Sequence, residues 1–137
     1  MVKIAFVSKN NACRSQIAEC VCKQLAQENV ECFSAGVVKK SKINSYAVGI
    51  LEEKYNIDIT LTQYPKTLEE LPRVDIVIAI GDDLGGINLP HKHCETWNIE
   101  DPNRKGYYEF EHCVNEFEQK IKDLLCRINK CSDVEKI

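Results

Sequence analysis

The sequence predicts an α/β domain built on a parallel sheet that is covered by helices on both faces. Short apolar runs typical of buried strands alternate along the chain with segments whose apolar residues recur every three or four positions, as in amphipathic helices. The connections between the apolar runs are long enough to carry a helix, which parallel strands require. The strongest run, Val74 to Ile80, is apolar at every position but one, so both faces of that strand are expected to be buried.

The first half of the chain is expected to form strand, loop, helix, strand and helix. Residues 3–7 form a short apolar run, and a polar segment follows it. A helix is expected from Arg14 to about Gln27, because apolar residues recur there every four positions. Residues 31–35 predict a second strand, and residues 43–55 carry apolar residues at helical spacing.

The second half is expected to add two strands and a long helix. The strand at 74–80 ends at segment 81–86, whose glycines and aspartates are typical of a turn. Residues 96–99 predict a short fourth strand. The chain closes with a long amphipathic helix. Its apolar face is formed by Phe110, Val114, Phe117, Ile121, Leu124 and Ile128.

Length and composition are those of one globular domain. The chain has 137 residues, enough for a single core, and residues 1–137 are expected to form one domain. Its 18 basic and 21 acidic side chains give a net charge of −3, which argues against a general nucleic-acid-binding protein. The longest apolar runs are far shorter than the roughly 20 residues that span a bilayer, and the N-terminus lacks the apolar core of a secretory signal peptide. We therefore expect no nucleic-acid or membrane partner and a cytoplasmic protein.

Eight cysteines would suit a disulfide scaffold in a small secreted protein, but this chain is larger and shows no export signal. Most of the thiols are therefore expected to be reduced. Cys20 and Cys22 are interpreted as small apolar residues that fill space on the first helix, and Cys113 and Cys126 fall within the C-terminal helix in the same way.

The polar segment from Ser8 to Ser15 is the strongest candidate for a functional site. Ligands of parallel α/β sheets bind beyond the carboxyl ends of the strands, where this segment is expected to lie. It contains neither GxGxxG nor GxxxxGK[ST], which disfavours a nucleotide-binding enzyme. Its sequence, SKNNACRS, leads directly into a helix, so backbone N–H groups and the positive end of the helix dipole would bind a tetrahedral oxyanion. Arg14 would add a planar, two-pronged donor for that anion.

With these residues in view, the sequence resembles the low-molecular-weight protein tyrosine phosphatase superfamily, in particular its thioredoxin-coupled arsenate reductase branch. The motif of the family after the first strand is C-x5-R-S, and here Ser8, Arg14 and Ser15 stand at its fixed positions. Reductases have Gln after the Arg-Ser pair where phosphatases usually have Pro, and this chain has Gln16. Three further segments are similar to that branch: Phe33 to Gly36, Asn56 to Ile59, and Trp97 with Asp101 and Pro102.

The resemblance implies a four-stranded parallel sheet with flanking helices and assigns roles to the site residues. In the family, a thiolate at the first loop position attacks phosphorus or arsenic in line. The arginine binds the equatorial oxygens, and the aspartate of the Asp-Pro loop protonates the leaving oxygen. By position, Arg14 and Asp101 take these two roles, Ser15 hydrogen-bonds the residue at position 8, and Asn11 holds the shape of the loop.

The resemblance also implies the ligands. Phosphate, sulfate or arsenate is expected to bind, with a phosphotyrosine protein or thioredoxin as candidate protein partners. Tyr107 and Tyr108 either contact a phosphotyrosine ring or pack at the start of the last helix. The expected substrate contacts are the loop residues Lys9, Asn10, Asn11, Ala12, Cys13 and Arg14.

Ser8 is the first departure from the family, which has its nucleophilic cysteine at this position. A serine hydroxyl is a far weaker acid than a thiol, whose pKa is about 8.5, and no neighbouring side chain is placed by sequence as a base for it. The chain is therefore predicted to bind oxyanions but to turn them over poorly. Two alternatives stay open: an enzyme trapped in an inactive form by a substitution at position 8, or a natural pseudoenzyme that binds phosphate or a phosphorylated partner.

The second departure concerns redox chemistry. Reductases of this branch pass the oxidation on through two cysteines in the loop after the third strand, and residues 80–90 contain none. Cys94 is the only nearby thiol, and one thiol cannot form the second, internal disulfide of that relay. Arsenate reduction is therefore expected to be weak. Cys13 is either a reactive thiol beside Arg14 or a packing residue of the loop.

A zinc site at residues 91–94 is a weaker hypothesis. His91, His93 and Cys94 would share one face of an extended segment, but no fourth ligand stands at the usual spacing. Solvated or locally hydrogen-bonded histidines are the favoured interpretation.

A potassium site is the second cation hypothesis. Glu19, Ser34 and Asn11 are similar to positions that hold a potassium ion in some arsenate reductases, while Pro65 replaces a further acidic ligand. The resemblance leaves this site open, and no metal or other cofactor is assigned to the reaction.

Overall fold

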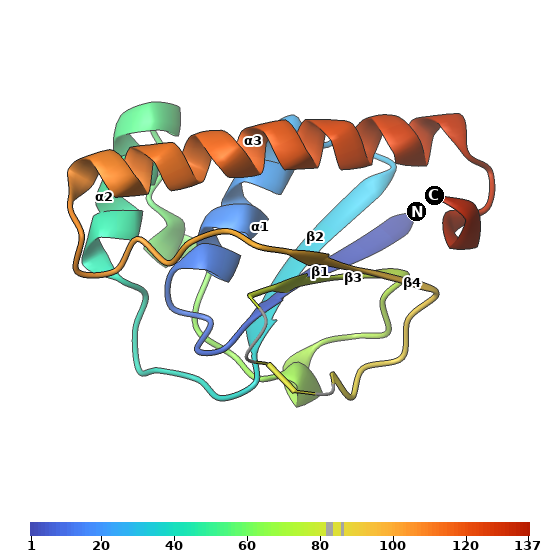
Figure 1. The fold of residues 1–137 in the computed structure, drawn as a ribbon, viewed down its shortest axis with the longest axis horizontal. Helices are drawn as coiled ribbons and strands as arrows, with labels where there is room; N and C mark the ends of the chain where they lie inside the picture. Colours follow the sequence, from blue (N-terminus) through green and yellow to red (C-terminus); the bar gives the residue numbers. More distant parts are fainter. Residues whose placement is uncertain (82–83, 86) are drawn as a thin grey trace.

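The structure is a computed structural model that describes residues 1–81, 84–85 and 87–137. It contains a sheet of four parallel strands in the order β2-β1-β3-β4 (Figure 1). The strands are β1 (Val2–Ser8), β2 (Val30–Gly36), β3 (Ile76–Ile80) and β4 (His93–Trp97). The α-helices are α1 (Arg14–Leu25), α2 (Ser45–Tyr55) and α3 (Tyr107–Lys130). The predicted α/β class with a four-stranded parallel sheet is confirmed.

β1 lies at the centre of the sheet and sets the position of the polar segment that follows it. It pairs along its length with β2, from Val2 opposite Val30 to Ser8 opposite Gly36, and on its other side with β3. The chain therefore adds one strand on one side of β1 and the next on the other side. Ligands of such sheets bind beyond the strand ends where the winding reverses, and the 8–15 segment begins there.

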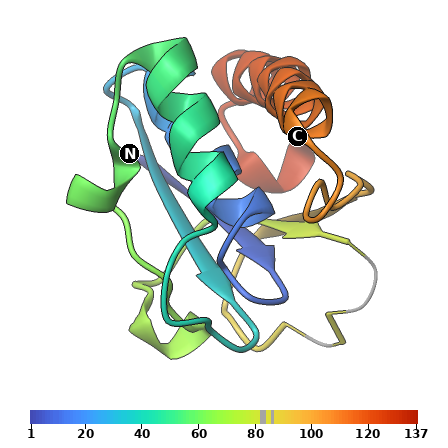
Figure 2. The ribbon, with the colours of Figure 1, turned by 90° about the vertical axis from the view of Figure 1, so that its left-hand side faces the viewer.

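The two faces of the sheet are covered differently (Figure 2). Alternate residues of a strand point to opposite faces. Ile4 and Phe6 belong to the larger core, to which α1, α2 and α3 contribute their inner faces. Ala5 and Val7 belong to a smaller core, which is completed by loop residues and the 3-10 helix Leu68–Glu70. In the described part of the chain, the three α-helices thus cover one face of the sheet. The short 3-10 helix Leu68–Glu70 is the helical element on the other face.

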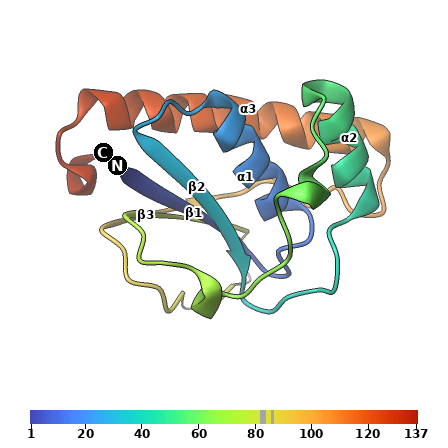
Figure 3. The same cartoon turned by 180° about the vertical axis from the view of Figure 1, so that it is seen from behind.

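α3 packs along the molecule above α1, with α2 beside them (Figures 1 and 3). A fully buried Val, Leu, Ile or Phe side chain contributes roughly 1.5–3 kcal/mol to the stability of the fold. The apolar stripe of α3 therefore fixes this helix firmly to the core. The predicted stripe is confirmed, because all of its members are buried: Phe110, Val114, Phe117, Ile121, Leu124 and Ile128. Within the described ranges, no helix is both long and apolar enough to cross a membrane.

β4 is the one strand that was placed wrongly from sequence. It covers His93–Trp97 rather than residues 96–99. Among the residues that the structure describes, β4 pairs with β3 alone. It is an edge strand, so its residues alternate between half-buried and exposed until Trp97. A strand of this kind lacks the continuous apolar run that marks β1 and β3. The predicted turn at 81–86 lies partly outside the described residues.

A disulfide joins Cys22 of α1 to Cys32 of β2. The interpretation of Cys22 as a simple apolar residue was therefore wrong in one respect: the side chain is buried as expected, but its sulfur is bonded. The bond crosses the contact between α1 and β2, which the sequence spacing alone does not reveal. The other six cysteines are free, as expected for most of the thiols.

Gly36 lets the end of β2 approach the 8–15 segment closely. A Cβ atom there would touch the carbonyl oxygen of Val38 and lie 2.8 Å from the backbone nitrogen of Asn11. Because these are backbone atoms, they cannot rotate away. We expect Gly36→Ala to lower the free energy of unfolding by about 1–3 kcal/mol, measured by urea denaturation.

Gly49→Ala is the matched control for this substitution. An added Cβ at Gly49 meets nothing within 4 Å, and the residue lies inside α2. We therefore expect Gly49→Ala to raise the free energy of unfolding by up to about 1 kcal/mol. Wild-type stability for Gly36→Ala would contradict the close approach of β2 to the loop.

Candidate functional site

A cleft of about 370 Å³ opens where the 8–14 loop meets the segment after β2. The segment around Asp101 and Asn103, far away in the sequence, completes the wall. The lining residues are Ser8, Lys9, Asn10, Ala12, Cys13, Arg14, Lys40, Ser41, Lys42, Ile43, Asn44, Ser45, Asp101 and Asn103. The structure therefore brings most of the predicted site residues together. Asn11 and Ser15 do not line this cleft and lie buried behind it.

The backbone of the 8–14 loop turns its carbonyl groups toward neighbouring segments. Four bonds show this: Val37 N to Ser8 O (3.1 Å), Val38 N to Lys9 O (3.0 Å), Lys40 N to Asn10 O (3.3 Å) and Asn44 N to Ala12 O (2.7 Å). In a trans peptide the N–H group points opposite to the C=O group. The N–H groups of these peptide units therefore point toward the inside of the loop, which is the arrangement of a backbone anion nest.

The N-terminus of α1 adds to this nest. α1 begins at Arg14, directly after the loop, and its N-cap residue Cys13 makes no side-chain hydrogen bond to the first turn. The first N–H groups of the helix are then left for a ligand, and the helix dipole adds a partial positive charge. The first turn of α1 also carries no acidic side chain that would compete with an anion.

Asn11 holds the loop in a backbone conformation that few residues adopt. Its φ is 51°, in the left-handed region that asparagine tolerates better than most residues. Its side chain is fully buried, and Nδ2 donates to Ser15 Oγ at 2.8 Å. Its Oδ1 accepts from Gln16 Nε2 and from the backbone nitrogen of Lys66, both at 2.9 Å. These contacts fix the loop from behind and are not contacts to a ligand in the cleft.

Ser8 and Ser15 are joined by a short hydrogen bond of 2.5 Å between their hydroxyl oxygens. Asn11 Nδ2 donates to one lone pair of the Ser15 oxygen, and either hydroxyl can supply the proton of the bond between Ser8 and Ser15. When Ser15 supplies it, Ser8 is the acceptor. A donor in this position stabilises negative charge on the side-chain atom of residue 8.

Gln16 and Gln63 form a buried clamp behind the loop. Gln16 Nε2 donates to the backbone oxygen of Asn11 at 3.0 Å and to the Tyr64 carbonyl at 3.1 Å. Gln63 Nε2 in turn donates to Gln16 Oε1 at 2.8 Å. Gln16 was noted in the sequence only as a mark of the reductase branch. Nothing in the sequence points to Gln63, which comes 47 residues later.

Arg14 and Asp101 line the cleft from distant parts of the chain. Arg14 Nη1 donates to the carbonyl oxygen of Ile99 at 2.9 Å, which anchors the guanidinium beside the segment that carries Asp101. Asp101 Oδ1 accepts from the backbone nitrogen of Asn103 at 3.0 Å, and this local turn holds the exposed carboxylate at the rim.

The lining of the cleft is rich in cations. Lys9, Lys40 and Lys42 accompany Arg14, and Asp101 is the acidic residue among the described lining residues. Such a surface attracts anions. Lys40 and Lys42 were missed as site residues, although the lysine-rich run at 39–42, shortly after the carboxyl end of β2, is a signal that would have found them.

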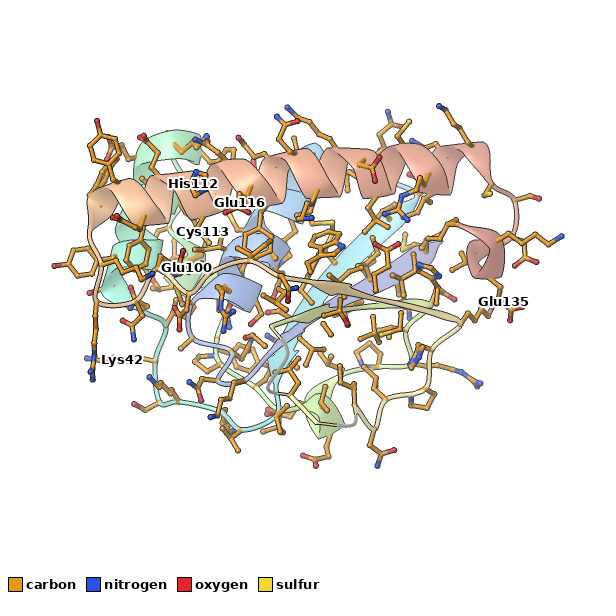
Figure 4. All side chains as sticks on the ribbon, viewed as in Figure 1. Lys42, Glu100, His112, Cys113, Glu116 and Glu135 are labelled. Atoms are coloured by element: carbon orange, nitrogen blue, oxygen red, sulfur yellow. A yellow bond between two sulfur atoms is a disulfide. The ribbon has the colours of Figure 1, made fainter. Side chains whose placement is uncertain are left out.

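Asp101 also lines a second, small cavity of about 20 Å³. Glu100, Cys113, His112 and Glu116 contribute to its wall (Figure 4). His112 Nε2 lies 3.1 Å from Glu116 Oε1, and burial raises the pKa of the Cys113 thiol. Among the described residues, no cluster here or elsewhere has the three metal-binding side chains that a metal site needs.

The zinc hypothesis for residues 91–94 finds no support in the described structure. His91 Nδ1 lies 2.7 Å from the Leu89 carbonyl oxygen, and His93 Nε2 lies 2.8 Å from Glu95 Oε2. The histidines thus have separate local partners, which agrees with the favoured interpretation.

Tyr107 and Tyr108 lie outside the cleft. The Tyr107 hydroxyl donates to Glu53 Oε2 at 2.6 Å and so links α3 to α2, while the Tyr108 side chain is 82% exposed. Of the two alternatives for this pair, the structure favours a place at the start of the last helix.

Cys13 has the properties of a packing residue. Burial raises the pKa of its thiol to about 12, the nearby Asp101 carboxylate acts in the same direction, and Arg14 and Lys40 oppose the shift. A thiol with this pKa stays protonated at neutral pH and is a poor nucleophile. The raised pKa favours the packing interpretation of Cys13, which also lines the cleft.

Comparison with known proteins gives a consistent result. Residues 3–134 match the low molecular weight phosphotyrosine protein phosphatase family. A glutaredoxin arsenate reductase of Synechocystis is 29% identical over 134 residues, covering 94% of this chain and all of that protein.

Solved structures of relatives share the fold, and two of them illustrate it. An arsenate reductase in the phosphate binding state has a TM-score of 0.81 and 29% identity, covering 93% of this chain and 99% of that one. A low molecular weight protein tyrosine phosphatase from T. tengcongensis has a TM-score of 0.79 and 25% identity, covering 93% of this chain and 100% of that one.

We expect Cys13 to resist alkylation in the folded protein. At about pH 8, a thiol with a pKa of about 12 is only about one part in 10⁴ thiolate. Iodoacetamide should therefore modify the exposed Cys126 at least about 100 times faster than Cys13. Peptide mass spectrometry measures both rates, and the urea-unfolded chain, in which the two should react alike, is the control. Fast labelling of Cys13 in the folded protein would contradict its role as a packing residue.

Proposed function

Because the chain belongs to the low molecular weight phosphotyrosine protein phosphatase family, we propose that its cleft binds phosphate or arsenate through the 8–14 loop and Arg14. Ser8 then stands at the position of the nucleophile, and Asp101 is the general acid. The observation that carries the proposal is the convergence of three anion-binding features on one cleft: inward loop amides, the N-terminus of α1 and an anchored arginine.

The electrostatics of the lining support this assignment. A tetrahedral dianion placed inside the loop would meet backbone N–H donors on one side and the Arg14 guanidinium on another, and both interactions strengthen when water leaves the cleft. Lys9, Lys40 and Lys42 would attract the anion from solvent. The similar arsenate reductase that was solved in a phosphate binding state points to the same class of ligand.

Ser8 limits the chemistry that follows binding. In-line attack would form a bond from Ser8 Oγ to phosphorus or arsenic while the bond to the leaving oxygen breaks and Asp101 gives that oxygen a proton. The proton of Ser8 must leave as well, and the described cleft holds no histidine that would accept it. We therefore propose that the chain binds oxyanions and turns them over slowly.

A natural pseudoenzyme is the second candidate, because every anion-binding feature of the cleft is independent of the side chain at position 8. In that case the ligand is phosphate or a phosphorylated partner that is held without turnover. The partner would be recognised through its phosphate and charge rather than through an aromatic ring, since the described lining contains no aromatic side chain.

Thioredoxin is the weaker of the proposed partners. The proposed site lacks the two relay cysteines after β3, and Cys94 lies exposed on β4 with no second thiol at residues 80–90. The disulfide between Cys22 and Cys32 is buried in the core and does not line the cleft.

We expect Arg14→Ala to lower the affinity for phosphate at least about 30-fold, since a hydrogen-bonded charge pair contributes about 2 kcal/mol or more. Isothermal titration calorimetry with inorganic phosphate measures the loss. Arg73→Ala, which removes an exposed arginine outside the cleft, is the control and should bind as the wild type does. Unchanged affinity of Arg14→Ala would remove the proposed site.

We expect Ser8→Cys to raise the rate of p-nitrophenyl phosphate hydrolysis at least about 100-fold, because the loop would then stabilise a thiolate nucleophile. Ser41→Cys, which places a thiol in the same cleft but outside the loop, should show no gain. Absence of a gain in Ser8→Cys would favour the pseudoenzyme.

With arsenate and a thioredoxin system, Ser8→Cys should turn over little, and fast reduction would show that other cysteines complete the relay.

A further inference from the structure

A buried cluster of charges lies behind the oxyanion loop, outside the lining of the cleft. Its centre is the carboxylate of Glu19, which is nearly inaccessible to solvent. Ser34 Oγ donates to Glu19 Oε1 at 2.5 Å, and Lys66 Nζ lies 3.8 Å from the same oxygen. Lys23 Nζ lies 2.5 Å from the other oxygen. A buried carboxylate requires such compensation, because removing its charge from water without a partner costs several kcal/mol.

The two lysines of the cluster differ in their surroundings. The Lys66 side chain is 11% exposed, whereas that of Lys23 is 38% exposed. Lys66 Nζ also donates to the Tyr64 carbonyl at 3.0 Å and lies 4.8 Å from the centre of the Tyr64 ring. Burial lowers the pKa of Lys66, and Glu19 opposes that shift. Lys66 is therefore the interior cation of the pair, and Lys23 is the cation at the surface.

Lys66 is also directly connected to the loop. The Tyr64 carbonyl that accepts from Lys66 Nζ accepts from Gln16 Nε2 as well. Gln16 holds Asn11 through both oxygens of that residue, and Asn11 holds Ser15. A continuous set of buried and partly buried hydrogen bonds thus runs from the ammonium group to the hydroxyl beside position 8.

Glu19, Ser34 and Asn11 are the residues at which the resemblance suggests a potassium ion, and their contacts do not fit a potassium ion here. The Asn11 side-chain oxygen already accepts from Gln16 Nε2 and from the backbone nitrogen of Lys66, which occupies both of its lone pairs. Ser34 and the ammonium of Lys66 both lie at the same oxygen of Glu19. A further positive ion among these groups would be repelled by the ammonium.

We propose that Lys66 is a positioning residue that acts as the built-in cation of the oxyanion site. Its ammonium group takes the place of a free monovalent cation between Glu19 and the Tyr64 carbonyl, and so holds the Gln16 and Asn11 contacts that shape the loop. This inference rests on the proposed function, since the loop it positions is the proposed phosphate site. It makes phosphate binding by the intact chain independent of potassium.

The test compares phosphate affinity by titration calorimetry in potassium chloride and in choline chloride at equal ionic strength. The wild type should bind equally in both salts. Lys66→Ala, which keeps the backbone bond to Asn11 but removes the ammonium, should bind about tenfold more weakly in choline chloride and regain most of that affinity in potassium chloride. Potassium would then occupy the space that the ammonium left beside Glu19.

Lys23→Ala is the matched control, since it removes the other ammonium group from the same carboxylate. It should bind phosphate within about twofold of the wild type and show no preference for potassium. The proposal is overturned if Lys66→Ala binds like the wild type, if both lysine variants lose affinity equally, or if potassium strengthens binding to the wild type.

Thermal unfolding provides a readout that does not depend on phosphate. Potassium should raise the Tm of Lys66→Ala relative to choline and leave that of the wild type unchanged. If the wild type binds no phosphate at all, the proposed function fails, and this potassium-dependent stabilisation still decides whether Lys66 replaces a free cation. Where Lys66→Ala is too unstable to purify, Lys66→Gln takes its place. Stabilisation of that variant by potassium supports the proposal, and equal stability in potassium and choline overturns it.

Discussion

The proposed anion-binding geometry includes a left-handed turn at Asn11, the backbone conformation in which the loop directs its N–H groups inward. The Asn11 side chain holds this turn by donating one hydrogen bond and accepting two, and the partner residue in each is itself buried. A buried polar group left without a partner costs about 1–3 kcal/mol, so the loop cannot relax without losing several such bonds at once. The shape of the cleft is thus set from behind, by side chains that a ligand in the cleft does not touch.

The fold was predictable because its central elements carry strong local patterns. β1 and β3 are buried on both faces and are therefore continuous apolar runs, and α3 buries one stripe at helical spacing. The same reasoning fails at the edges. Within the described ranges, β4 pairs on one side only, and its residues alternate between half-buried and exposed. The second face of the sheet is covered by loops and a 3-10 helix, which have no periodic pattern. The bond between Cys22 and Cys32 depends on the packing of α1 against β2, which no local pattern records.

The site, like the fold, could be predicted from the sequence only where its residues form a local structure. Ser8, Arg14 and Ser15 are close in sequence, because a loop between a strand and a helix is a local structure. The partners that hold this loop come from residues 63–66, about 50 positions later along the chain, where neither periodicity nor a motif marks them. Gln63 and Lys66 therefore became visible only when the fold placed them behind the loop. Charged and amide side chains in a polar stretch are usually solvated, so their burial here is information that only the tertiary structure contains.

Binding and chemistry are separable in this cleft, because the groups that attract an anion are not the group that would attack it. In a thiolate enzyme the positive field of the loop serves both steps, since it lowers the pKa of the thiol and then binds the oxyanion. A helix N-terminus supplies at most about 2 kcal/mol, which is about 1.5 pKa units at about 1.4 kcal/mol per unit, and a serine hydroxyl is a far weaker acid than a thiol. Ser8 therefore stays neutral. A thiolate at that position would repel an incoming dianion a few ångströms away, whereas a neutral hydroxyl does not. In the proposed site, a neutral Ser8 therefore leaves the whole positive potential of the loop, of α1 and of Arg14 available to a bound anion.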